Sequence, residues 1–298
     1  MAIPVHVIAG FLGSGKTTLM NHLLGARPAD LRPAIIVNDF GDVALDGDLI
    51  DRSGYALKEL PSGCVCCTLK GPLAETLGTF ASEIAPDVIL METTGIAVPA
   101  DIAAIFRSAE LEPFVQIGNV VCVIDACSFL KYEPHFAILG IQVQQANTIL
   151  LNKTDLVPEN RLNATRNRIE YLCLPDSKVI ETQHCKLDSE AIYQNRNVYF
   201  PVSRHSHTHD EFSSFSFESE KIASLEKLES LFGTLENGIL RAKGIVRTDG
   251  GEKVVQWTLS GCEIGDWNQD VERSRLVFVG KDLRPEELEE RVSQIFLA

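Results

Sequence analysis

A glycine-rich segment near the amino terminus places the strongest constraint on how this chain folds. Residues 10–17 read Gly-Phe-Leu-Gly-Ser-Gly-Lys-Thr and stand between an apolar, β-favouring run, Val5–Ala9, and a helical segment, Thr17–Leu24. Such a turn between a buried strand and a helix is typical of a phosphate-binding loop, whose backbone N–H groups converge on phosphate oxygens. The sequence therefore predicts an α/β fold built around a nucleotide.

The next two hundred residues alternate between apolar runs and helical stretches. Near-continuous apolar runs are typical of strands buried on both faces of a parallel sheet, whose ligands bind at the carboxyl ends of the strands. We predict a phosphate-loop NTPase fold with a doubly wound, mostly parallel sheet. The other predicted strands are Ala34–Val37, Val88–Met91, Val120–Ile124 and Thr148–Leu151, and the other helices are Gly71–Ala85, Ile102–Ala109 and Glu159–Leu172.

The composition changes after about residue 202. Residues Ser203–Ser216 are rich in Ser, His and Asp and are expected to form an exposed connection. Beyond them, helical segments at Leu225–Leu240 and Pro285–Phe296 enclose strand-like alternation, which indicates a small α+β domain. We predict a nucleotide-binding domain at residues 1–202, a histidine-containing linker at residues 203–212 and a C-terminal domain at residues 213–298. The predicted strands of that last domain are Gly244–Thr248, Lys253–Leu259 and Arg275–Val279.

Charge and composition narrow the function classes. The chain has 27 Lys and Arg against 41 Asp and Glu, a net charge of −14, so we expect no nucleic-acid or anionic membrane partner. It has no run of about 18 apolar residues, as a membrane helix needs, and its apolar start lacks a charged leader, so we expect a cytoplasmic protein. In that compartment, eight cysteines indicate metal or redox chemistry rather than a disulfide framework.

Two motifs supply groups for phosphate chemistry. In the loop, Lys16 can neutralise the β and γ phosphates and Thr17 can offer a hydroxyl to Mg²⁺. Glu92-Thr-Thr-Gly95 follows a strand, where Glu92 can contact Mg²⁺ through water or orient the attacking water and Gly95 lets the backbone approach the γ-phosphate. The alternative for Glu92 is a carboxylate at a helix start. The predicted phosphate contacts are Gly10, Gly13, Ser14, Gly15, Lys16, Thr17, Thr18 and Gly95.

A third motif favours guanine over adenine. Asn152-Lys153-Thr-Asp155 directly follows the strand Thr148–Leu151. The Asp155 carboxylate can accept hydrogen bonds from both N1–H and the exocyclic amine of guanine, a donor pair that adenine lacks. Alone the motif would be a turn or a helix cap, but downstream of a phosphate loop it predicts GTP. Asp125, after the strand Val120–Ile124, is either a further site residue or structural.

A cysteine cluster points to a metal site. Cys64, Cys66 and Cys67 can supply most of a tetrahedral thiolate shell that suits Zn²⁺ or a related ion. The alternatives are a buried apolar turn or a redox pair.

Asp39 and Asp42 follow the strand Ala34–Val37 and are expected either to complete this shell, to meet Mg²⁺, or to be ordinary turn residues. His205–His209 is either a loose metal tract or a solvated loop. We expect the remaining cysteines to be packing residues: Cys122, Cys127, Cys173, Cys185 and Cys262.

Together these motifs resemble the CobW family of phosphate-loop GTPases, which are regarded as metal chaperones or metallocentre-insertion proteins. The resemblance covers almost the whole chain, and it departs from the family where shorter aspartates, Asp39 and Asp42, replace the usual glutamates. The shorter side chains put metal ligation by Asp39 in question, and ligation by Asp42 more so. The motifs that carry the resemblance are Gly10–Thr18, Asn38–Asp42, Gly63–Cys67, Glu92–Gly95, Asn152–Asp155 and Arg241–Gly244.

The resemblance implies GTP hydrolysis with Mg²⁺, coupled to binding of Zn²⁺, Co²⁺ or Ni²⁺ by the cysteines and to delivery of the metal. The recipient would be a client metalloprotein or an enzyme of a metal-cofactor pathway. Lys16, Thr17 and Glu92 are the expected catalytic residues, and the active form is either a monomer or a homodimer. Two other functions remain open: a kinase or other ATPase with structural cysteines, and a non-catalytic metal-storage or regulatory module.

Overall fold

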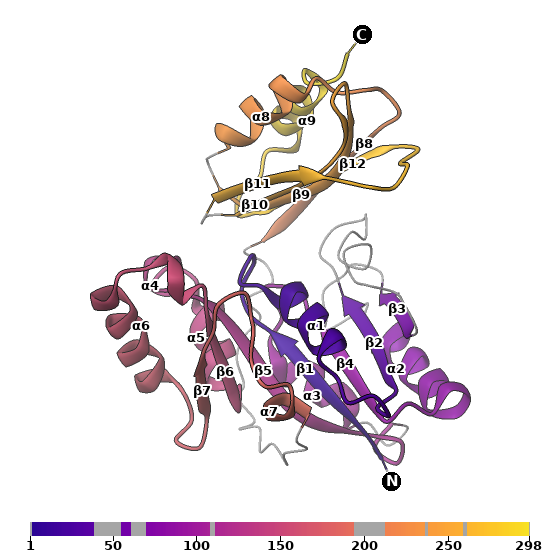
Figure 1. Cartoon of the computed structure of the whole chain (residues 1–298), viewed down its shortest axis with the longest axis vertical. Coiled ribbons are helices and arrows are strands. Elements are labelled where there is room, and N and C mark those ends of the chain that lie inside the picture. Colours follow the sequence, from indigo (N-terminus) through magenta and orange to yellow (C-terminus); the bar gives the residue numbers. More distant parts are fainter. Residues whose placement is uncertain are drawn as a thin grey trace. The chain divides into compact units, whose positions relative to one another are not determined.

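The computed structural model describes residues 2–38, 55–60, 70–107, 111–193, 212–235, 238–258 and 261–297. The chain divides into two compact units, which are described separately. The larger unit contains a seven-stranded sheet and the smaller unit a five-stranded sheet (Figure 1). Across the described ranges, no helix is long and apolar enough to cross a membrane.

The sheet of the larger unit is parallel throughout. Its strands lie in the order β3-β2-β4-β1-β5-β6-β7, and each neighbouring pair runs in the same direction. The chain extends to one side of β1 through β2 and β3 and to the other through β5, β6 and β7, so a topological switch point lies beside β1. The strands are β1 (Ile3–Ala9), β2 (Pro33–Asn38), β3 (Ala56–Leu60), β4 (Val88–Glu92), β5 (Val115–Asp125), β6 (Thr148–Asn152) and β7 (Lys178–Glu181).

Helices connect and cover these strands (Figure 1). Helix α1 packs on β1 and β4, α2 on β3, α3 on β5, and α5 on α6. This arrangement confirms the predicted doubly wound α/β fold. The helices are α1 (Lys16–Gly25), α2 (Lys70–Thr79, continued by the π-helical turn Phe80–Ile84), α3 (Pro99–Phe106), α4 (Phe129–Tyr132), α5 (Ala137–Gln144), α6 (Glu159–Leu172) and α7 (Glu190–Tyr193).

The core explains why the strand positions were predictable. Every residue of β2, β4 and β6 is buried, as expected for strands covered on both faces. On one face Ile35, Leu90 and Val123 pack against Leu19 and Leu23 of α1. Burial of these side chains fixes α1 against the sheet and thereby places its amino terminus at the carboxyl edge of β1.

A buried histidine occupies an irregularity between β1 and β5. The register of the pair shifts between Val5 and Val7, and His6, which lies between them, is fully buried. The backbone N–H of Asn119 donates to His6 Nδ1 at 2.7 Å. Burial lowers the pKa of His6 to about 4, so the ring is neutral at pH 7.

The smaller unit is an antiparallel sheet with two helices. Its strands lie in the order β11-β10-β9-β12-β8. Helices α8 (Leu225–Gly233) and α9 (Pro285–Ser293) pack their apolar sides, including Leu228, Phe232 and Val292, against Phe278 and its neighbours in the sheet. The strands are β8 (Ser213–Ser219), β9 (Ile239–Thr248), β10 (Gly251–Thr258), β11 (Gly261–Asp266) and β12 (Ser274–Gly280).

Two predictions for the smaller unit are wrong. The predicted helix Leu225–Leu240 ends at Gly233, and its last two residues instead begin β9, where Ile239 pairs with Gly280. The exposed connection predicted at Ser203–Ser216 is a strand from Ser213 onward, because the half-buried Phe215 packs on the core. In the first case the apolar pair Ile239 and Leu240 was taken for the end of a helix, and in the second Phe215 was taken for part of a polar connection.

Candidate nucleotide site

The glycine-rich loop adopts a backbone that only glycine tolerates well. Gly10, Gly13 and Gly15 have φ values of +138°, +74° and +113°. A Cβ at Gly10 would lie 2.3 Å from the Val123 carbonyl oxygen, and one at Gly15 would lie 2.6 Å from Asn152 Nδ2. Helix α1 begins directly after Gly15 with neither a side-chain cap nor an acidic residue in its first turn. Its first N–H groups and its dipole therefore suit an anion.

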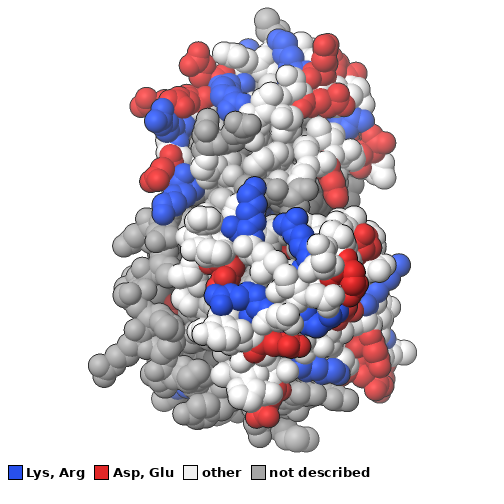
Figure 2. All heavy atoms as spheres, turned by 90° about the vertical axis from the view of Figure 1, so that its left-hand side faces the viewer, with Lys and Arg blue, Asp and Glu red and all other residues white. Residues whose placement is uncertain are grey.

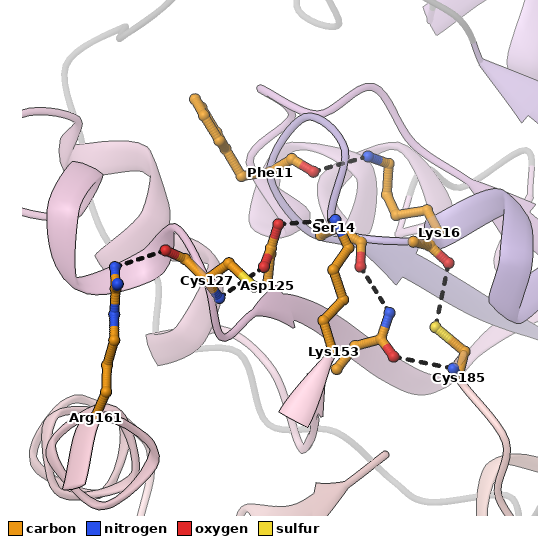
Figure 3. A network of polar contacts seen from close by, with 10 residues as sticks. Phe11, Ser14, Lys16, Asp125, Cys127, Lys153, Arg161 and Cys185 are labelled. Atoms are coloured by element: carbon orange, nitrogen blue, oxygen red, sulfur yellow. Dashed lines mark hydrogen bonds and ion pairs between the residues drawn. The ribbon is translucent and has the colours of Figure 1, made fainter. Parts of the chain in front are cut away.

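Lys16 is held within this loop. Its side chain is 4% exposed, and Nζ donates to the carbonyl oxygens of Gly10 at 3.0 Å and Phe11 at 3.2 Å (Figure 3). Both acceptors belong to the loop itself, so the ammonium group lies against the backbone that would surround the phosphates. The amine is thus positioned to add a positive charge where helix α1 already favours an anion.

A carboxylate from β4 reaches the first turn of α1. Thr17 Oγ1 donates to Glu92 Oε1 at 3.0 Å, and Glu92 is 1% exposed. The strand register explains the meeting, because Glu92 pairs with Ile8 of β1 and with Val37 of β2, close to the carboxyl end of each strand. A hydroxyl and a carboxylate oxygen are ligands that Mg²⁺ prefers, either directly or through water, so this pair fits a magnesium ion.

The segment after Glu92 packs directly on the glycine-rich loop. A Cβ at Gly95 would lie 2.5 Å from Leu12 Cδ2 and 2.7 Å from the Leu12 backbone nitrogen. The backbone N–H of Thr93 donates to the Ile8 carbonyl at 3.0 Å, which continues the strand contact one residue further. The two segments predicted to contact phosphates therefore lie against each other.

At the other end of the loop, one amide joins two segments. Asn152 Nδ2 donates to the Ser14 carbonyl at 3.0 Å, while its Oδ1 accepts the backbone N–H of Cys185 at 2.9 Å and the hydroxyl of Thr182 at 3.3 Å. Asn152 is 2% exposed and ends β6. Its side chain thus fixes the glycine-rich loop to the segment that follows β7.

The residues after Asn152 form a short, charged turn. Lys153 has φ +61°, and its Nζ donates to Asp125 Oδ2 at 2.9 Å (Figure 3). Asp125 also accepts the backbone N–H of Cys127 at 2.8 Å, so it is a structural partner of this turn. Asp155 lies in the 3₁₀ turn Thr154–Leu156 and is exposed. Its carboxylate is accessible to a ligand beside the fixed Lys153.

Cys185 is a packing residue, as expected, and it also contacts the glycine-rich loop. It is fully buried, and its thiol donates to the Gly15 carbonyl at 3.4 Å. Burial raises the pKa of Cys185 to about 12, so the thiol stays protonated. His184 and Cys185 both have φ above +50°. The sequence offered no local signal for this contact, because β7, the strand before this segment, was not predicted.

Basic side chains near this turn are interspersed with acidic ones. Figure 2 shows blue and red groups mixed over the face of the larger unit that carries α4 and α6. On that face Arg168 pairs with Glu133 at 2.7 Å, and Arg166 pairs with Glu181. The described surface drawn there carries both signs of charge rather than a continuous basic patch.

The predicted metal ligands lie outside the described residues. This applies to Asp39, Asp42, Cys64, Cys66 and Cys67, and also to His205–His209. Within the ranges that the structure describes, no group of three or more His, Cys, Asp or Glu residues is arranged to hold a metal ion. The acidic segment follows the end of β2 at Asn38 and the cysteine segment follows the end of β3 at Leu60, and these two residues are paired in register.

Comparisons with known proteins agree with this architecture. Residues 4–180 match the CobW/HypB/UreG nucleotide-binding domain, and residues 212–296 match the cobalamin synthesis protein cobW C-terminal domain. The chain is 30% identical over 295 residues to zinc chaperone CobW from Sinorhizobium sp, covering 83% of this chain and 82% of the relative. It is 28% identical over 312 residues to zinc chaperone YjiA of Escherichia coli K12, covering 96% of both.

A solved structure supports the same fold. The crystal structure of Zn(II)-bound YjiA GTPase from E. coli covers 100% of both chains with a TM-score of 0.50 at 22% sequence identity. The family models together span most of the sequence, and the first alone matches more than half of it. These matches agree with the parallel sheet that carries the glycine-rich loop and with the antiparallel C-terminal unit, and they show that this chain belongs to the CobW family.

Proposed function

We propose that this chain is a GTP-hydrolysing metal chaperone that couples its nucleotide state to the binding and delivery of a metal ion. The observation that carries the nucleotide half is the joint geometry of the glycine-rich loop. Glu92 meets its Thr17 at one end, and Asn152 holds its Ser14 at the other. The two named relatives, both zinc chaperones, support the metal-binding part of the proposal.

In the nucleotide half, each residue has a role that its position supports. The N–H groups of residues 13–18 bind the phosphates, and Lys16 neutralises charge on the β and γ phosphates. Thr17 and Glu92 would hold Mg²⁺, directly or through water, and the ion would supply positive charge against the phosphates. Glu92 also orients the attacking water, and Gly95 lets backbone N–H groups approach the γ-phosphate. Each of these groups stabilises charge or geometry of the transferred phosphoryl group.

Guanine is recognised at the other end of the loop. Asp155 accepts the two guanine N–H donors, and the aliphatic stem of Lys153 lies along the base. The ion pair between Lys153 and Asp125 supports this placement, because it fixes the lysine head while leaving its stem available. Asn152 orients the loop that binds the phosphates rather than acting on the base alone.

In the metal half, Cys64, Cys66 and Cys67 bind Zn²⁺, or Co²⁺ or Ni²⁺, as thiolates. Asp39 is the proposed additional ligand. The pairing of Asn38 with Leu60 supports this, since the acidic and cysteine segments leave the same edge of neighbouring strands. Asp42 lies three residues further along and is the weaker candidate. The metal passes to a client metalloprotein or to an enzyme of a metal-cofactor pathway.

We further propose that GTP controls the metal site through these two segments. The acidic segment follows β2, whose Val37 pairs with Glu92, and the cysteine segment follows β3, which pairs with β2. The terminal phosphate can therefore order both segments in turn and set the thiolate geometry, which hydrolysis then loosens. Linkage makes this reciprocal, because metal must change GTP affinity by the factor by which GTP changes metal affinity. Residues 1–202 then act as the GTPase domain, residues 203–212 as the linker and residues 213–298 as the C-terminal domain.

The test uses Co²⁺ as a spectroscopic substitute for Zn²⁺. We expect an intense sulfur-to-metal charge-transfer band with about one Co²⁺ per chain, absent from Cys66→Ser. Co²⁺ affinity should differ between a non-hydrolysable GTP analogue and GDP by about 1–3 kcal/mol. Deleting residues 205–209 is the control and should leave the band unchanged. Identical Co²⁺ affinities in the two nucleotide states would refute the chaperone cycle.

A further inference from the structure

The segment between Glu92 and α3 is irregular but buried. Thr93, Thr94, Ile96 and Ala97 are each at most 5% exposed, and the segment forms no strand pairing beyond Thr93. Buried backbone carbonyls outside regular structure need hydrogen-bond donors from elsewhere in the fold. The identity of those donors determines how firmly the segment is held.

Gln142 of α5 supplies two of these donors. Its Nε2 donates to the Gly95 carbonyl at 3.1 Å and to the Ala97 carbonyl at 3.0 Å, and the side chain is 1% exposed. One turn later, Gln145 Oε1 accepts the backbone N–H of Ala100 in the first turn of α3 at 2.9 Å. Gln142 in α5 and Gln145 directly after it therefore hold successive parts of one segment, and Gln142 holds the part nearest Glu92.

The residue that precedes α5 contacts the glycine-rich loop. Phe136, which precedes α5, stacks on Phe11 of the loop with ring centroids 5.7 Å apart. Gly95 meets Leu12, the next residue of the loop, on one side and Gln142 on the other. Gly95 has no side chain of its own to fix its peptide planes, so these contacts set their orientation.

We propose that Gln142 is a positioning residue for GTP hydrolysis, which fixes the Gly95 peptide so that the segment presents its backbone to the γ-phosphate in one orientation. The inference rests on the proposed GTPase function. Gln142 touches neither nucleotide nor metal in this scheme, and it acts only through the Gly95 and Ala97 carbonyls. Displacement of a group by about 1 Å can cost about 10²-fold in rate, so such support has a measurable effect.

This role differs from that of its neighbour. Gln145 anchors the start of α3, five residues beyond Gly95, whereas Gln142 holds Gly95 directly. A purely structural role would make the two substitutions equivalent in activity once stability is matched. A positioning role would make Gln142 selective for the step in which the γ-phosphate is transferred.

The experiment compares Gln142→Met with Gln145→Met, since methionine fills a similar volume without hydrogen-bonding groups. For Gln142→Met, kcat for GTP should fall by at least about 10-fold while GDP affinity stays within about 2-fold of the unmutated chain. For Gln145→Met, the melting temperature should fall by about as much as it does for Gln142→Met. Its kcat should stay within about 3-fold of the unmutated chain. If Gln142→Met does not fold, Gln142→Asn replaces it in the comparison. Its side chain keeps the N–H donor but is one methylene shorter, so its kcat should lie below that of the unmutated chain while Gln145→Met stays within about 3-fold.

Several results would overturn the proposal. An unchanged kcat in Gln142→Met would do so, as would equal losses of kcat in both variants or a parallel loss of GDP affinity. If the unmutated chain binds GTP without hydrolysing it, the proposed function fails separately. In that case the affinity of a non-hydrolysable GTP analogue relative to GDP still tests positioning, because Gln142→Met should change this ratio and Gln145→Met should not.

Discussion

In the proposed GTP site, Asp155 is the side chain that selects guanine. Replacing it by Asn substitutes an N–H₂ group for one of the two carboxylate oxygens that face the guanine donors. In competition with a labelled GTP analogue, GTP should outcompete ATP by at least about 10²-fold, about 2.7 kcal/mol, and Asp155→Asn should remove most of this preference. Equal competition by ATP in the unmutated chain would favour the kinase or ATPase alternative.

His6 should make stability depend on pH in a defined window. Its pKa is lowered to about 4 in the fold, against about 6.5 when unfolded, so proton uptake favours the unfolded state. Above about pH 6.5 the ring is neutral in both states and does not change the free energy of unfolding. At about pH 4 the low pKa of His6 reduces the free energy of unfolding by about 3 kcal/mol.

Urea unfolding at several pH values checks this prediction. His6→Asn keeps an acceptor for the Asn119 N–H and should reduce the loss of stability between pH 6.5 and 4, whereas His135→Asn, at an exposed position, should not. Parallel stability curves for the unmutated chain and His6→Asn would show that this ring does not control the acid response.

At the scale of elements, the contact between the segment after β4 and the glycine-rich loop leaves no room for a side chain. Gly95→Ala places a methyl group within 2.7 Å of two Leu12 atoms, so one segment must move. We expect a loss of about 1–3 kcal/mol in stability together with most of the GTP turnover, measured by thermal unfolding and phosphate release.

The matched control for Gly95→Ala is Gly78→Ala in α2. A Cβ at Gly78 meets nothing within 4 Å, so this change should stabilise the protein by about 0.5–1 kcal/mol and leave turnover unaffected. Normal turnover in Gly95→Ala would mean that the segment adjusts without disturbing the phosphates.

Elements buried on both faces were predictable from their sequence, while those at edges were not. Strands β1, β2, β4 and β6 appear as continuous apolar runs because both of their faces are covered. Strand β7 was missed because it lies at the edge of the sheet, where its terminal residues Lys178 and Glu181 are exposed. Apolar content alone also extended the helix that begins at Leu225 past Gly233, because the apolar pair Ile239 and Leu240 suits a helix or a strand equally.

The same distinction applies to the candidate site. Lys16, Glu92 and Asn152 follow buried strands or glycine turns, and these local patterns indicate a ligand-binding edge. Gln142 and Cys185 have no such pattern, because their contacts depend on where α5 and the segment after β7 pack in the folded chain.

At the scale of the whole molecule, the proposed nucleotide and metal sites use different residues and can be separated by mutation. Lys16→Ala removes the amine that lies against the glycine-rich loop but leaves all three cysteines in place. GTP turnover should fall by at least about 10²-fold while the Co²⁺ charge-transfer band persists. Phosphate release and absorbance on the same sample check both halves, and normal hydrolysis by Lys16→Ala would place the catalytic site elsewhere.

The Asn152 amide has a consequence for how the two ends of a nucleotide are read. Its nitrogen holds the Ser14 carbonyl, and the turn that carries Asp155 directly follows Asn152, so in the proposed GTP site ordering of the phosphate end should also order the base end. GTP should therefore bind more strongly than the sum of the binding free energies of guanosine alone and of triphosphate alone predicts. This excess should remain after correction for the entropy of association, which GTP loses once and the two separate ligands lose twice. A triphosphate with the wrong base should then meet a less well ordered loop, so that phosphate recognition would include an indirect check of the base.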